Sequence, residues 1–198
     1  FDLNFEGKSA SLTLQIPGRH NALNAAGAVA VLVGHGFDFE LSCKAVAGFG
    51  GTVRRFELHG VARGVSVYDD FAHHPTEVAA ALAGARAAVG DGKLITVFQP
   101  HLYSRTRIFA AEFAQALALS DQVVITDVYA AREDPEPGVT GALIADRISD
   151  RSKVHYVEKW EDVASVAAGL ASSGDFIITM GCGDIFRMVP ELLGALEA

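Results

Sequence analysis

Short apolar runs alternate with longer helical stretches through most of the chain, and this alternation limits the fold more than any other feature. The runs are rich in β-branched and aromatic side chains. Continuous apolar strands separated by helices are typical of a mostly parallel sheet covered on both faces. We therefore predict an α/β, Rossmann-like fold, with strands at 65–68, 94–98, 123–126, 154–157 and 176–180 and helices at about 75–89, 106–119, 140–149, 160–172 and 185–196.

The beginning of the chain has a different pattern. Residues 1–16 alternate apolar and polar side chains, which predicts a β-hairpin that ends at Pro17. Asn21 is placed to cap a following helix, and a second short helix is expected at about 39–47. These elements bury too little apolar surface to form a core alone, so we interpret residues 1–48 as the end of a preceding domain.

Glycines mark the predicted domain boundary. Three of the four residues from 48 to 51 are glycine, which gives the backbone freedom and leaves little side chain to pack. We predict a hinge at 49–53 and a complete domain at 54–198.

Composition and charge exclude several classes of protein. Half of the 198 residues are apolar, and the net charge is −8 without a long Lys/Arg run, so we expect no nucleic-acid partner and no anionic membrane surface. No apolar stretch reaches the roughly 18 residues that span a bilayer. The two cysteines, Cys43 and Cys182, are far apart and indicate a reducing, cytoplasmic location. The chain starts at Phe1 without an initiator methionine or a signal peptide, so we expect it to be part of a longer polypeptide.

Polar residues follow three of the predicted strands directly. Ligands of open α/β sheets bind beyond the carboxyl ends of the strands, so these residues predict one polar site at that edge. The three segments are 69–75, with two aspartates and two histidines, 99–107, with a histidine, a tyrosine and two arginines, and 181–184, with a glycine turn.

The aspartate and histidine segment allows three interpretations. The four side chains could bind a divalent metal ion, because carboxylates and imidazoles are both ligands. They could instead contact a nucleotide or another anion. Pro75 also favours a helix start, where His74 or an aspartate would act only as a cap.

The arginines of the second segment suggest an anion partner. Arg105 and Arg107 fall near the start of a predicted helix, where the helix dipole disfavours cations. A guanidinium fork matches the two oxygens of a carboxylate or phosphate. The alternative is two solvated arginines.

The glycine turn is a weaker signal. It begins like a dinucleotide fingerprint, but Phe186 stands where the third glycine would be, so a tight turn capped by Asp184 is the simpler interpretation. Cys182 could be a reactive thiol at a helix N-terminus or only a small residue that fits the turn.

Two further pairs could bind ligands. Asn21 and Asn24 are three residues apart, so their amides can face the same side of a helix. Arg54 and Arg55 follow the glycine hinge and could be either a ligand contact or a solvated pair of charges.

Several strings in the same order resemble the Mur ligases of peptidoglycan synthesis. The strings at 69–77, 98–106 and 127–133 are similar to the alanine-adding branch of that family, and the first of them is also similar to the ligase that recycles murein tripeptide. The strings are His20-Asn21-Ala22-Leu23-Asn24-Ala25, Arg54-Arg55-Phe56-Glu57, Asp69-Asp70-Phe71-Ala72-His73-His74-Pro75-Thr76-Glu77, Phe98-Gln99-Pro100-His101-Leu102-Tyr103-Ser104-Arg105-Thr106 and Asp127-Val128-Tyr129-Ala130-Ala131-Arg132-Glu133.

The resemblance implies an ATP-dependent amide ligase. In such a ligase ATP phosphorylates the carboxylate of UDP-N-acetylmuramate, the amino group of L-alanine attacks the acyl phosphate, and Mg²⁺ bridges the nucleotide phosphates. Residues 1–48 would then be the end of a central ATP-binding domain, and upstream domains of the same polypeptide would be partners. By matching positions, Arg55, Asp70 and His73 would be catalytic, Asn21, Asn24, Arg55 and Asp70 would contact ATP, and Phe71, His73, His101, Tyr103 and Arg105 would receive L-alanine.

Some features depart from the family pattern. The family often has arginine where this chain has Leu102 and alanine where it has Cys182. The chain also contains no G-x-x-x-x-G-K-[ST] phosphate loop, so most contacts to ATP, and those to Mg²⁺, would lie upstream and the chain alone would be inactive. A ligase for murein tripeptide and a non-catalytic module that binds a nucleotide or an amino acid are the alternatives.

Overall fold

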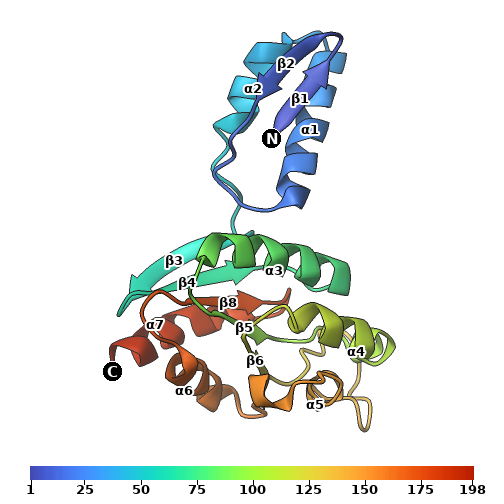
Figure 1. Cartoon of the computed structure of the whole chain (residues 1–198). Coiled ribbons are helices and arrows are strands. Elements are labelled where there is room, and N and C mark those ends of the chain that lie inside the picture. The colour runs from blue at the N-terminus through green and yellow to red at the C-terminus, as the bar shows by residue number, and fades with distance from the viewer. The chain divides into compact units, whose positions relative to one another are not determined.

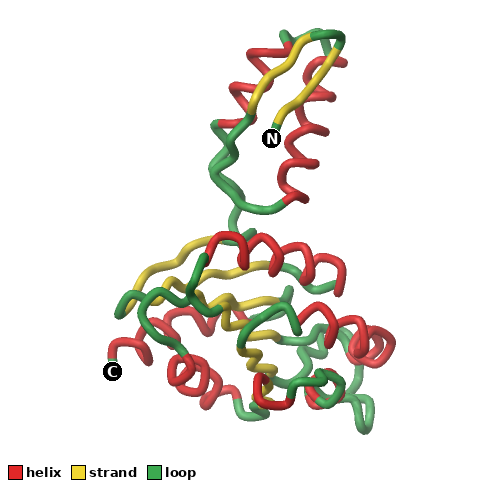
Figure 2. Tube along the Cα trace, viewed as in Figure 1, coloured by secondary structure: helices red, strands yellow, loops and turns green.

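The computed structural model describes all residues from Phe1 to Ala198 and divides into two compact units, Phe1–Thr52 and Val53–Ala198. Figure 1 shows the elements of each unit, and Figure 2 shows the same chain coloured by secondary structure. The division falls within the segment that the sequence predicts as a hinge. Hinge motion and the identity of the first unit as the end of an ATP-binding domain stay predictions.

The first unit is a hairpin packed with two helices. Strands β1 (Asp2–Phe5) and β2 (Lys8–Ser11) pair antiparallel, and helices α1 (Arg19–Gly34) and α2 (Phe39–Ala47) follow. The predicted hairpin is confirmed, although it ends at residue 11 and not at 16. The small core of this unit consists of Leu12, Val29, Phe39 and Cys43.

The predicted capping role of Asn21 is wrong. Gly18 holds the N-cap position of α1 without a side-chain cap, because α1 starts at Arg19. Asn21 therefore lies inside the first turn, where its amide nitrogen donates to the carbonyl oxygen of Pro17 at 2.6 Å.

The second unit is built on one six-stranded sheet with the order β3-β4-β8-β5-β6-β7. β3 pairs antiparallel with β4, and the other neighbours are parallel. The predicted α/β class is therefore confirmed. The strands are β3 (Glu57–Ala62), β4 (Val65–Asp70), β5 (Leu94–Phe98), β6 (Gln122–Ile125), β7 (Val154–Tyr156) and β8 (Phe176–Met180).

Helices cover both faces of this sheet. α3 (Pro75–Val89), α4 (Tyr103–Leu117) and α5 (Ala142–Ala145) contribute to one apolar cluster, and α6 (Trp160–Leu170) and α7 (Val189–Glu197) contribute to a second. Two short 3₁₀ turns, η1 (Arg151–Lys153) and η2 (Ile185–Met188), precede β7 and α7. The chain contains no helix long and apolar enough to cross a membrane.

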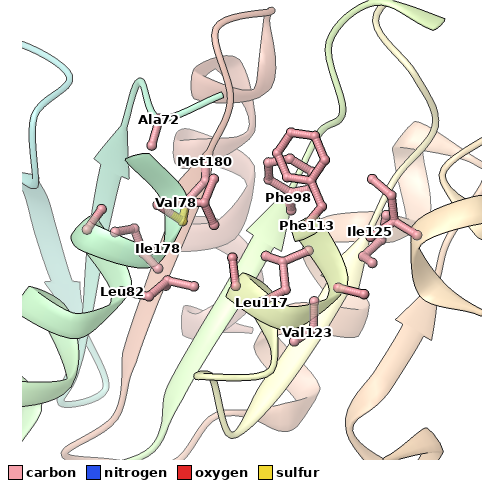
Figure 3. Close-up of a cluster of buried hydrophobic side chains, with 14 of the residues drawn as sticks. Ala72, Val78, Leu82, Phe98, Phe113, Leu117, Val123, Ile125, Ile178 and Met180 are labelled. Carbon is pink, nitrogen blue, oxygen red and sulfur yellow. The ribbon is translucent and has the colours of Figure 1, made fainter. Parts of the chain in front are cut away.

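Successive side chains of the central strands point to opposite faces of the sheet, so the core has one apolar cluster on each face. In β5, Phe98 joins the cluster under α3 and α4, whereas Ile95 and Val97 join the cluster under α6 and α7. Figure 3 shows the first cluster, in which the rings of Phe98 and Phe113 lie together with centroids 5.1 Å apart. Both faces of these strands are buried, which explains their continuous apolar sequence.

Three sequence predictions need correction in this unit. The strand β3 was not expected, because the sequence at 57–62 is interrupted by a glycine and the pairing with β4 shifts register between Leu58 and Gly60. The predicted helix at 140–149 is only the four residues of α5. The predicted helix at 185–196 is divided into η2 and α7, with Pro190 near the start of α7.

We expect residues 53–198 to fold without the first unit. This part has its own sheet and two apolar clusters, so its stability does not need the small core of residues 1–52. Circular dichroism on a chain of residues 53–198 should show α/β structure and one cooperative thermal transition. Persistent aggregation without a cooperative transition would contradict this boundary.

Candidate functional site

The ends of three neighbouring strands define the candidate site. β8 lies between β4 and β5, and its last residue, Met180, is level with Asp70 of β4 and Phe98 of β5. All three strands run parallel, so the segments that follow them leave the sheet at the same edge. This is the edge that the sequence predicts, and the loop after β6 joins it through a bridge between His101 and Tyr129.

Arg54 fixes this edge through a shielded ion pair. Its Nε lies 2.7 Å from Oδ2 of Asp69, which is fully buried and also accepts a hydrogen bond from the Thr179 hydroxyl at 2.6 Å. Nη2 of Arg54 donates to the carbonyl oxygen of Gly181 at 2.7 Å. The guanidinium therefore joins β4 to the turn after β8, and it has the role of a structural clamp.

Aromatic rings cover the Arg54 guanidinium on two sides. Its central carbon lies 4.9 Å from the ring centre of Phe71 and 4.6 Å from that of Phe186. Arg55, by contrast, is exposed, with its guanidinium 5.8 Å from the Phe71 ring. Of the two arginines, Arg55 is the one with a guanidinium open to solvent.

Asp70 holds backbone groups on either side of the strand end. Oδ1 accepts the N–H of Ala72 at 2.8 Å, and Oδ2 accepts the N–H of Phe56 at 2.9 Å. Burial raises the pKa of this carboxyl, and the two N–H donors and the charge of Arg55 partly oppose the increase. A ligand that contacts Asp70 directly would have to share oxygens that already accept backbone hydrogen bonds.

His74 and Glu77 cap the start of α3. His74 is the N-cap residue, with its Nδ1 3.4 Å from the N–H of Thr76, and the Glu77 carboxylate accepts the N–H groups of His73 and His74. Burial alone would raise the pKa of Glu77, but these N–H groups and the charges of His73 and Arg55 hold it below its usual value. The capping interpretation of His74 is confirmed.

The His73 ring has a fixed orientation. Its Nδ1 lies 2.9 Å from the carbonyl oxygen of Phe71 and 3.3 Å from a carboxylate oxygen of Glu77. A carbonyl oxygen can only accept, so Nδ1 carries a proton in this arrangement.

His101 lies between His73 and Tyr129. The His101 ring is stacked on Tyr129, with centroids 5.7 Å apart and an interplanar angle of 17°, and its edge-to-face contact with His73 has a centroid distance of 6.3 Å. Burial lowers the pKa of His101, and the charges of Arg105, His73 and Arg132 lower it further, against a weaker opposing effect of Glu133. Nδ1 of His101 is buried and has no hydrogen-bond partner.

Arg105 connects the segments after β4 and β8. Its Nη1 donates to the carbonyl oxygen of His73 at 3.4 Å, and its guanidinium lies close enough to Cys182 to lower the pKa of that thiol. Burial raises the pKa of Cys182, and Arg105 partly opposes the increase. The thiol is therefore held mostly protonated. Arg107 instead pairs with Glu136 at 2.8 Å on the surface, in agreement with the alternative of a solvated arginine.

Glu133 caps α4 from a different loop. The N-cap residue Leu102 has no capping side chain and a φ of 72°, in the left-handed region. The Glu133 carboxylate accepts the N–H of Ser104 at 2.9 Å and also the Ser104 hydroxyl. It thus stabilises the first turn of α4, which carries Tyr103 and Arg105.

Tyr129, Glu133 and Gln99 are not among the site residues that the sequence predicts. Gln99 donates to Asp184 at 2.8 Å and accepts the N–H of Ile185 at 3.2 Å, so it fixes the turn after β8. Asp184 therefore binds Gln99 and makes no side-chain cap, contrary to the cap expected from the sequence. Tyr129 and Glu133 follow the predicted strand that became β6. Ligands of open α/β sheets bind beyond the carboxyl ends of the strands, so the position after β6 was the signal that could have indicated these two residues.

The remaining predicted residues are distributed between the two units. Asn21 is partly buried and Asn24 is exposed, both on α1 of the first unit. Phe71, His73, His101 and Arg105 lie together in the second unit, and Tyr103 is the first residue of α4. No cluster of three or more His, Cys, Asp or Glu side chains is arranged to hold a metal ion. Asp69, Asp70 and His74 instead have the partners described above.

Comparison with known proteins identifies the family. The family model described as "Mur ligase, glutamate ligase domain" matches residues 54–183, which is more than half of the chain. This chain belongs to the Mur ligase family. The curated UDP-N-acetylmuramate–L-alanine ligase of Clavibacter sepedonicus is 56% identical over 198 residues, which cover 100% of this chain and 42% of that protein. The chain thus spans about two fifths of that relative's length.

Two solved structures extend the comparison. The UDP-N-acetylmuramate–alanine ligase MurC of Thermotoga maritima has a TM-score of 0.76 and 30% identity, and the match covers 92% of this chain and 39% of that one. A domain named as a UDP-N-acetylmuramate:L-alanyl-γ-D-glutamyl-diaminopimelate ligase, from Haemophilus ducreyi 35000HP, has a TM-score of 0.56 and 26% identity. That match covers 72% of this chain and 99% of the other, so the other protein was crystallised as a separate domain.

We expect Gly183→Ala to disturb the site and Gly194→Ala to leave it intact. A Cβ at Gly183 would lie 2.5 Å from Oε1 of Gln99 and 2.8 Å from Cγ of Tyr129, so the ring stacked on His101 must move. Thermal or urea unfolding of Gly183→Ala should show a free energy of unfolding lower by about 1–3 kcal/mol. At Gly194, in α7, the space around a Cβ is open. Alanine there should raise the free energy of unfolding by about 0.5–1 kcal/mol, because glycine is unfavourable within a helix. Equal effects of the two substitutions would contradict the packing at Gly183.

Asp70 should make a stability contribution that decreases as the pH rises. Its pKa in the folded state is raised by burial, so ionisation is less favourable in the folded chain than in the unfolded chain. The difference in free energy of unfolding between the native chain and Asp70→Asn should therefore fall from about pH 4 upward and become constant above the folded pKa. Urea titrations from pH 4 to 8 measure this difference. Asp91→Asn, at an exposed position, is the control. A difference that grows with pH would mean that the Phe56 and Ala72 N–H groups outweigh burial.

Proposed function

We propose that this chain is the C-terminal part of an ATP-dependent ligase that joins L-alanine to UDP-N-acetylmuramate. The observation that carries the proposal is the 56% identity, over the whole chain, to a curated ligase of that name. Curated relatives of the same name from other bacteria, at 48% to 54% identity, support it further. The polar edge of the second unit supplies residues suited to an amino acid.

The reaction needs an amino acid held with its amino group free to attack. The amine of L-alanine adds to the carbonyl carbon of the muramoyl phosphate, inorganic phosphate leaves, and the amine gives up a proton. In this proposal Arg105 pairs with the carboxylate of L-alanine, because two guanidinium N–H groups match two oxygens. Phe71, His73, His101 and Tyr103 enclose the small side chain and the amino group.

The chain would make only accessory contacts to ATP. Arg55 is exposed and could contact a phosphate. Asp70 orders the backbone nearby, because it accepts the N–H groups of Phe56 and Ala72. Asn24, exposed on α1, and Asn21 are the proposed contacts in the first unit. Mg²⁺ would accompany the nucleotide and bridge its phosphates, and the contacts to the ion are proposed to lie mainly upstream of this chain.

Phosphate release by the full-length protein tests the ligase proposal. With ATP, Mg²⁺ and UDP-N-acetylmuramate present, we expect release to depend on L-alanine and not on murein tripeptide. Dependence on the tripeptide would instead favour the alternative of a ligase for murein tripeptide. If no phosphate is released with either acceptor, the ligase proposal is overturned and a binding module is favoured.

Arg105→Ala provides the residue-level form of the same prediction. Loss of the carboxylate partner should raise the KM for L-alanine by about tenfold or more, with a smaller change in kcat. Arg107→Ala is the matched control, because Arg107 is on the same helix but pairs with Glu136 on the surface. Equal KM values for the two variants would remove Arg105 from the site.

A further inference from the structure

We propose that Arg54 is a positioning residue and that it acts through its neighbour Arg55. The Arg54 side chain holds the first residues of the second unit in a strained backbone conformation. That conformation presents the Arg55 guanidinium at the edge of the sheet, where it can bind an anionic phosphate group. The role of Arg55 toward ATP rests on the proposed function, whereas the holding role of Arg54 follows from contacts within the second unit.

The backbone on either side of Arg55 has an unfavourable conformation. Arg54 has a φ of 59° and Phe56 has a φ of 48°, and both values lie in the left-handed region that residues other than glycine rarely adopt. Residues of this kind persist only where surrounding contacts hold them, and they are concentrated at functional sites. The segment 54–56 therefore needs firm anchors.

Backbone hydrogen bonds anchor this segment to β4 and its neighbourhood. The N–H of Phe56 donates to Oδ2 of Asp70 at 2.9 Å, and the N–H of Arg54 donates to the Glu57 carboxylate at 2.7 Å. The carbonyl oxygen of Arg54 accepts the N–H of Phe71 at 2.7 Å. None of these bonds reaches the turn that follows β8.

The Arg54 side chain supplies the anchor to that turn. Nη2 donates to the carbonyl oxygen of Gly181 at 2.7 Å, while Nε pairs with the buried Asp69 at 2.7 Å. The rings of Phe71 and Phe186 cover the guanidinium. A planar guanidinium makes these contacts at the same time, whereas the compact ammonium group of a lysine does not have this geometry.

The ion pair with Asp69 also leaves Arg55 available to a ligand. A fully buried carboxylate that lost its partner would be strongly unfavourable, and a nearby cation would be drawn toward it. Arg55 is such a cation, because its guanidinium lies 5.8 Å from the ring of Phe71 that also contacts Arg54. Since Arg54 already neutralises Asp69, Arg55 stays exposed.

A double-mutant cycle in the full-length protein tests whether Arg54 acts through Arg55. The measured quantity is kcat/KM for ATP in phosphate release that depends on L-alanine. Arg54→Lys keeps a cation beside Asp69 but loses the planar fork. We expect it to lower kcat/KM about tenfold in the native background and less than about twofold in the Arg55→Ala background. Equal factors in the two backgrounds, or no effect of Arg54→Lys, would overturn the proposal.

Two further variants guard against a purely structural effect. Arg187→Lys is the matched control, because Arg187 also lies near the ring of Phe186, at 5.9 Å, but is exposed. It should change kcat/KM for ATP by less than about twofold. Arg54→Met combined with Asp69→Asn removes the clamp without leaving a buried unpaired carboxylate, and it should lower kcat/KM as Arg54→Lys does. A native value for this combined variant would contradict the positioning role.

Nitrogen-15 relaxation of the 198-residue chain tests the holding role without any activity. The backbone amide of Arg55 should have an order parameter of about 0.85 in the native chain and below about 0.6 in Arg54→Lys. A value that stays near 0.85 in the variant would mean that other contacts hold the segment, and the proposal would be wrong. If the unsubstituted full-length protein shows no phosphate release dependent on L-alanine, the ligase proposal fails, but the relaxation result still decides whether Arg54 holds this segment.

Discussion

The position of β8 between β4 and β5 is the constraint on which the rest of the second unit depends. This last strand to be synthesised pairs with two strands that precede it by long stretches of chain, so the sheet centre is complete only after residue 180. The pairing brings the turn at Gly181 to the ends of both neighbours. Arg54 then closes this edge by bonding Asp69 and the Gly181 carbonyl together.

Much of this fold could be predicted because buried parallel strands have a simple sequence pattern. β5 and β8 are continuous apolar runs, and their predicted and observed bounds agree. β3 lacks such a pattern because it is an edge strand with exposed residues and a register shift near Gly60. The short length of α5 could not be predicted either, because apolar residues near 144–148 pack into the core whether or not they are helical.

The site was less predictable than the sheet, because sequence gives the position of a side chain but not its partner. The segments after β4, β5 and β8 were expected to meet, and they do. The sequence did not reveal that Arg54 is a clamp while Arg55 is free, because that difference depends on φ at Arg54 and on the buried Asp69. Tyr129 enters the site through backbone bonds with Pro100 and Leu102, and no local pattern encodes these.

The loop between β6 and α5 has a consequence for how such a site can diverge among species. Tyr129, on which His101 stacks, belongs to this loop. The loop is held by contacts to the α4 region: Tyr129 to Leu102, Glu133 to Ser104 and Glu136 to Arg107. The sheet does not depend on the residues between these anchors. Substitutions there can change the surface beside His101 while the sheet and its strand ends keep their positions, so this edge can diverge in sequence at little cost to folding.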